Sequence, residues 1–128
     1  MQNQRKESRK KLIAFTLVYD LLHKKLIGYV GDLTPQGVMV IGETALEVGR
    51  RLAIGIEFPN EELNEKPQRV VVSSRVAWCR QDEDTPQYLN IGFEFLELSP
   101  EGAEIIRVVL DRYQFRYVMN ISELKRKS

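Results

Sequence analysis

The chain has 128 residues and a formal net charge of +1, with 43% hydrophobic and 29% charged residues. This length is typical of one domain with one hydrophobic core, and the composition excludes disorder over most of the chain. A net charge this close to zero excludes a global electrostatic attraction to nucleic acid or membrane. The single cysteine and single histidine exclude an internal disulfide and a Cys/His metal site, so we expect no metal.

The first residues are basic, but no long uncharged apolar run follows them. The longest such stretch, residues 12–19, is far too short to span a bilayer. We therefore expect no signal peptide, no membrane insertion and a cytoplasmic location.

The first half of the chain alternates between strand-like and turn-like segments. Residues 1–11 are polar and strongly charged, which predicts a flexible basic arm. Gly31-Asp32 opens a turn that continues through Thr34, Pro35 and Gly37. β-Branched and aromatic residues, partly alternating with polar ones, predict strands on either side of these breaks. These strands are expected at residues 12–19, 25–30, 37–41 and 52–58.

Two further strands are expected in the second half. The longer one covers residues 69–79, and its alternation predicts one core-facing set of side chains. That set is Val70, Val72, Val76 and Trp78. After a polar turn at residues 80–87, the last strand is expected to present Ile91, Phe93 and Phe95 on one side.

The final element changes period and predicts a helix. Ser99 is typical of an N-cap, and Pro100 suits the first helical position. Apolar residues then recur at steps of three and four, which predicts one apolar stripe that packs on the sheet. The stripe comprises Ala103, Ile106, Leu110, Tyr113 and Tyr117.

Six short strands followed by a helix, without crossover helices, predict a mostly-β fold. We expect a small six-stranded antiparallel β-barrel with a C-terminal α-helix packed on it. The expected organisation is a flexible basic arm at residues 1–11, the barrel and helix at residues 12–118, and a charged tail at residues 119–128.

The chain offers no set of residues typical of an enzyme site. His23 stands in a polar connection, and Cys79 follows Trp78 on an expected strand, where a half-buried thiol is the ordinary interpretation. No nucleophile motif, phosphate-binding loop or paired-carboxylate pattern is present. We therefore expect a binding protein and not an enzyme.

Two short motifs suggest what the domain binds. Arg5 and Arg9 form an R-x-x-x-R pattern in the arm, and Asp32, Thr34 and Gly37 form a D-x-T-x-x-G pattern at a strand-to-strand turn. Each motif alone is common by chance, and Asp and Gly populate turns for local reasons. Their order, their positions and the expected barrel together resemble the PilZ domain family, over essentially the whole chain.

The resemblance implies a receptor for cyclic di-GMP, which offers two guanines and two phosphodiesters. Arginine suits this ligand because its guanidinium grips phosphates, bonds a guanine edge or stacks on a purine. Asp32 would accept hydrogen bonds from guanine, Thr34 would bond a phosphate or a guanine edge, and Gly37 would let the backbone bend where a side chain would clash. The implied ligand-binding residues are Arg5, Arg9, Asp32, Thr34 and Gly37, with Lys6 and Lys10 as electrostatic helpers.

One residue departs from the family pattern. Thr34 stands where the family usually has serine, which keeps the hydroxyl but adds a methyl group and a stiffer side chain. This departure keeps open a PilZ-like domain that no longer binds the dinucleotide and acts only as a protein-interaction adaptor.

The expected mechanism is ordering of the arm on ligand binding, which creates a surface for an unidentified effector protein. The sequence also leaves a homodimer open. A barrel that binds single-stranded nucleic acid through its basic ends is a further alternative, but the near-neutral net charge disfavours it.

Overall fold

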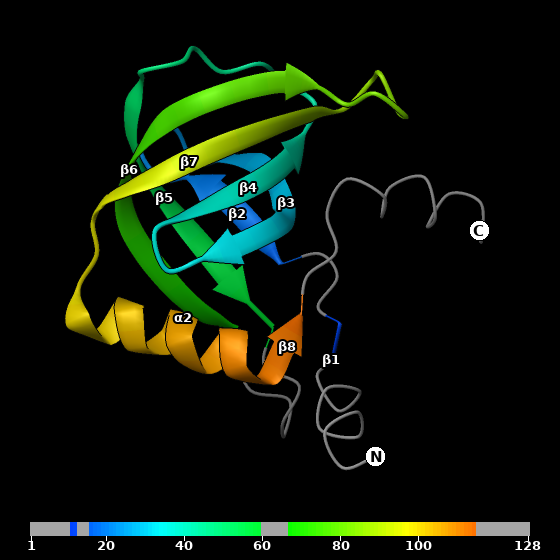
Figure 1. Cartoon of the computed structure of the whole chain (residues 1–128). Helices are drawn as coiled ribbons and strands as arrows, with labels where there is room; N and C mark the ends of the chain where they lie inside the picture. Colours follow the sequence, from blue (N-terminus) through cyan, green and yellow to red (C-terminus); the bar gives the residue numbers. More distant parts are fainter. Residues whose placement is uncertain (1–10, 13–15, 60–66, 115–128) are drawn as a thin grey trace.

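A computed structural model of the chain describes residues 11–12, 16–59 and 67–114. Within them, six antiparallel strands close into a barrel in the order β2-β3-β4-β7-β6-β5, and β5 returns to pair with β2 (Figure 1). The strands are β2 (Leu17–Asp20), β3 (Lys25–Thr34), β4 (Gly37–Gly42), β5 (Arg51–Phe58), β6 (Gln68–Gln81) and β7 (Leu89–Glu97). The predicted fold class is confirmed.

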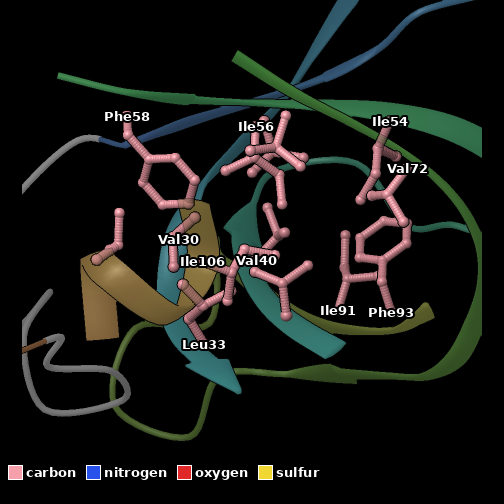
Figure 2. Close-up of a cluster of buried hydrophobic side chains, with 14 of the residues drawn as sticks. Val30, Leu33, Val40, Ile54, Ile56, Phe58, Val72, Ile91, Phe93 and Ile106 are labelled. Carbon is pink, nitrogen blue, oxygen red and sulfur yellow. The ribbon is translucent and has the colours of Figure 1, made fainter. Parts of the chain in front are cut away.

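The barrel is filled by the inward half of each alternating strand. On β5, Ile54, Ile56 and Phe58 are buried. Figure 2 shows these side chains meeting those of the facing strands in one cluster. Since each buried aliphatic or aromatic side chain contributes roughly 1.5–3 kcal/mol, this interior is the main source of stability.

Helix α2 (Pro100–Arg112) packs on one end of the barrel (Figure 1). It begins as predicted, because the Ser99 side chain accepts a hydrogen bond from the Gly102 N–H at 3.0 Å and Pro100 occupies the first turn. Ile106 and Val109 project into the barrel core. No helix within the described ranges is long and apolar enough to cross a membrane.

The predicted apolar stripe of this helix is partly wrong. Ala103 is exposed, and the buried positions are Gly102, Ile106 and Val109. The helix ends before Tyr113, because this residue adopts an extended backbone (φ −130°, ψ 159°). Leu110 is half-buried against the core as expected, whereas Tyr117 lies outside the described residues.

The extended residues after the helix pair with the start of the chain. Strand β8 (Tyr113–Gln114) runs parallel to β1 (Lys11–Leu12) in a separate two-stranded sheet. The prediction of one continuous strand at residues 12–19 is therefore wrong for Leu12, which pairs with β8 and not with the barrel.

A β-bulge extends β3 beyond its predicted end. Val30 pairs with Val40, and Asp32 pairs with the next residue, Met39, so Gly31 is an extra residue in the ladder. The turn predicted to open at Gly31-Asp32 is wrong, because the strand continues through the bulge to Thr34. The turn itself is only two residues long, at positions 35–36.

A second bulge corrects the predicted face of Trp78. Val76 pairs with Phe93 and Trp78 pairs with Gly92, which leaves Ala77 as an extra residue in β6. Because one extra residue reverses the inside–outside alternation, Trp78 lies on the outer surface and not beside Val76 in the core.

The packing of α2 yields a stability prediction. Ile106 is 1% exposed, so Ile106→Ala should lower the free energy of unfolding by about 2–5 kcal/mol through lost burial and a residual cavity. Leu22→Ala is a matched control, because Leu22 is 78% exposed and its truncation should change stability by less than about 0.5 kcal/mol. Urea denaturation measures both; equal losses would contradict the placement of α2.

Candidate ligand-binding site

Four residues from four neighbouring strands form one row on the outer surface of the barrel. The pairing register aligns Asp32 of β3 with Met39 of β4, Met39 with Gly92 of β7, and Gly92 with Trp78 of β6. The two bulges lie at the ends of this row, at Gly31 and Ala77. Without the bulges, the inside–outside alternation of β3 and β6 would have pointed both Asp32 and Trp78 into the core.

Two surface cavities share this row. The larger, of about 440 Å³, extends toward the connection between β6 and β7, and the smaller, of about 270 Å³, extends toward the turn between β3 and β4. Asp32, Met39 and Trp78 line both cavities. The row is therefore the common floor of a hollowed surface that spans four strands.

Gly92 allows Trp78 to lie across β7. A side-chain carbon at Gly92 would overlap the indole Nε1, so the ring occupies the space that a larger residue would fill. On β6, two residues further along, the Arg80 guanidinium carbon lies 4.9 Å from the indole centroid in a cation–π contact. Glycine, indole and guanidinium thus form a stack beside the larger cavity.

An outer apolar cluster supports the row from one side. Met39 and Ile41 are 7% and 1% exposed although they point away from the barrel interior. Tyr29, Trp78 and Tyr88 pack against them. Strand β4 is consequently buried on both faces, which fixes the floor of the site as firmly as a core strand.

The connection between β6 and β7 is built around a buried carboxylate. Asp82 is 1% exposed and accepts hydrogen bonds from the Thr85 N–H at 2.7 Å and from Asn90 Nδ2 at 3.2 Å. Burial, and then the nearby Tyr88 and Asp82, raise the pKa of Tyr29 to about 12. The Tyr29 phenol is therefore uncharged at neutral pH.

The turn between β3 and β4 is closed by the Thr34 hydroxyl. Its Oγ1 accepts from the N–H groups of Gln36 and Gly37 at 3.2 and 3.1 Å and lies 3.4 Å from the Gly37 carbonyl, to which it donates. Asp32 Oδ1 accepts from the Leu33 N–H at 2.9 Å, and no other partner for its carboxylate is found among the described residues. Asp32 therefore retains acceptor capacity facing the cavities.

The predicted reason for glycine at position 37 is confirmed in part, because a side chain would clash there but no special bend is present. Gly37 has no positive φ, so it does not supply a special bend. A side-chain carbon there would overlap the Phe93 carbonyl oxygen, because β4 and β7 approach closely at this point. Glycine is required by strand packing next to the smaller cavity.

The comparison with known families decides what kind of domain this is. A family model described as PilZ domain matches residues 3–115. The chain belongs to the PilZ domain family. No curated protein and no solved structure gave a match.

The structure describes only part of the predicted PilZ site, and the ligand-binding role of its residues stays a prediction. It brings Asp32, Thr34 and Gly37 together at the smaller cavity. The predicted arm residues Arg5, Lys6, Arg9 and Lys10 lie outside the described residues, although the family match includes them. PilZ domains are binding or adaptor modules. Within the described ranges, no group of three or more His, Cys, Asp or Glu residues could hold a metal ion.

Sequence reasoning missed Trp78, Arg80 and Gly92 as site residues. The alternation on β6 assigned Trp78 to the core, because a bulge at Ala77 leaves no mark in the hydrophobic pattern. The one available signal was a glycine inside a strand, at Gly92, which often marks the close approach of another group.

The Gly92–Trp78 contact can be tested by fluorescence, since Trp78 is the chain's one tryptophan. Gly92→Ala should displace the indole from β7 and shift its emission to longer wavelength as the ring becomes more hydrated. Ser73→Ala, at an exposed position on β6, the strand that carries Trp78, should leave the emission unchanged. A wild-type spectrum from a folded Gly92→Ala protein would contradict the contact.

Proposed function

We propose that this PilZ domain is a receptor for cyclic di-GMP that passes the signal to a partner protein. The observation that supports the proposal most strongly is the position of the D-x-T-x-x-G residues. Asp32, Thr34 and Gly37 line a surface cavity that continues into a larger one along a single strand row. The family match also begins before the arginines of the R-x-x-x-R motif.

The chemistry of these residues suits the two kinds of group on the dinucleotide. The Asp32 carboxylate accepts from the N1–H and N2–H donors of a guanine. Arg5 and Arg9 supply guanidinium groups that grip phosphate oxygens or bond guanine O6 and N7. The Thr34 hydroxyl can reach the ligand only by sharing or exchanging the hydrogen bonds that close its turn.

The arm converts binding into a signal. Ordering of each arm residue costs about 1–2 kcal/mol in backbone entropy, and each charge-assisted hydrogen bond contributes about 1.5–3 kcal/mol. These contributions nearly offset each other, which favours micromolar over picomolar affinity. The ordered arm and the bound ligand would then form a new surface for an effector protein.

A second candidate function is a PilZ adaptor that binds a protein without the dinucleotide. The observation that favours it is the Thr34 hydroxyl, which already serves the turn through two N–H groups and the Gly37 carbonyl. In this case the motif would be retained for the turn alone. Titration of the wild-type chain with cyclic di-GMP distinguishes the two functions.

Loss of one arm arginine provides the direct test. Arg9→Ala should weaken cyclic di-GMP binding by at least about tenfold, or ~1.4 kcal/mol, because a charge-assisted contact is lost. Calorimetric titration measures the change. Arg51→Ala is the matched control, since it removes the same charge from an exposed β5 position that lines neither cavity. Equal affinities of wild type and Arg9→Ala would contradict the proposed role of the arm.

A further inference from the structure

We propose that Arg80 is a third ligand-binding arginine, outside both signature motifs, which binds the O6 and N7 atoms of one guanine of the dinucleotide. The proposal rests on the proposed function and extends it to the larger cavity. It assigns that cavity to a purine base and not to a phosphodiester.

The Arg80 guanidinium has no hydrogen-bonding or ion-pair partner in the described part of the chain. Four other described arginines form ion pairs, namely Arg50 with Asp20, Arg69 with Glu57, Arg75 with Glu94, and Arg107 with Glu104 and Asp111. Arg51, Arg80 and Arg112 have no ion pair or hydrogen bond of the side chain among the residues that the structure describes. Of these three, Arg80 alone lines either cavity.

The guanidinium is nevertheless held in place. Its central carbon lies 4.9 Å from the Trp78 indole centroid in a cation–π contact, and no described residue accepts a hydrogen bond from its N–H donors. Trp78 is in turn seated over Gly92, and Arg80 pairs in register with Asn90 on β7. Trp78 and Gly92 therefore position the Arg80 guanidinium, which keeps its capacity to donate hydrogen bonds.

The charge of the larger cavity favours a base over a phosphate. Besides Arg80, four carboxylates line it, those of Asp32, Asp82, Glu83 and Asp84. A phosphodiester would meet a net negative surface there, and would be better placed with the basic arm. Guanine is uncharged and offers N1–H and N2–H donors to a carboxylate and O6 and N7 acceptors to an arginine fork.

The hydrogen bonds of the carboxylates that line the cavity indicate which one can accept from the guanine N1–H and N2–H donors. Both oxygens of Asp82 already accept hydrogen bonds, one from the Thr85 N–H and the other from Asn90 Nδ2 on β7. Asp32 retains acceptor capacity, and it shares the cavity with Arg80. A guanine bonded to Arg80 on one edge and to Asp32 on the next would satisfy both groups.

The test titrates wild type, Arg80→Ala, Arg80→Lys and Arg51→Ala with cyclic di-GMP by calorimetry. We expect Arg80→Ala and Arg80→Lys each to bind at least about tenfold more weakly, because lysine keeps the charge but not the bidentate fork. Arg51→Ala should bind as wild type does. A second titration uses the analogue with 7-deazaguanine, which lacks N7, and the loss caused by Arg80→Ala should be smaller with it.

The contrary results distinguish a failure of the proposed function from a failure of the role of Arg80. If the wild type does not bind cyclic di-GMP, the proposed function and the role of Arg80 both fall. If the wild type binds and Arg80→Ala binds equally well, only the role of Arg80 is overturned. Three results would show charge attraction alone and overturn the assignment of the cavity to a base. They are wild-type affinity in Arg80→Lys, an equal loss of affinity in Arg51→Ala, and a loss of affinity in Arg80→Ala that is the same for both dinucleotides.

Discussion

Two β-bulges determine which side chains this barrel presents along the row that forms the candidate site. Each inserts one residue, Gly31 in β3 and Ala77 in β6, and each reverses the inside–outside alternation of its strand. Their combined effect is to place Asp32 and Trp78 at opposite ends of one outer row. Without them, a carboxylate and an indole would point into a core built from aliphatic and phenyl side chains.

Burial of β4 on both of its faces fixes the floor of the candidate site. Val38 and Val40 fill the interior, while Met39 and Ile41 are covered from outside by aromatic side chains. The floor of the row is thus rigid before any ligand arrives. In the proposed receptor, the entropic cost of binding then falls mainly on the arm, which makes the arm the natural element for signalling.

The sequence predicted the elements of the fold better than the orientation of their side chains. Periodicity located the barrel strands and the start of α2 at Ser99, because alternation and N-capping are local properties. It misplaced Trp78, because a bulge depends on the partner strand. The pairing of Leu12 with Gln114 is likewise a contact between distant parts of the chain. For the site, motifs identified Asp32 and Thr34, whereas the Trp78–Arg80 contact became visible only through the register.

In the proposed receptor, the arm and the outer row act as one site. Amide hydrogen exchange with and without saturating cyclic di-GMP tests it most directly, because it reports on residues 1–11 and on the strands in one experiment. We expect simultaneous protection of residues 1–11 and of residues 32–39, with β5 unchanged. Unaltered exchange throughout, or protection that excludes either the arm or residues 32–39, would contradict it.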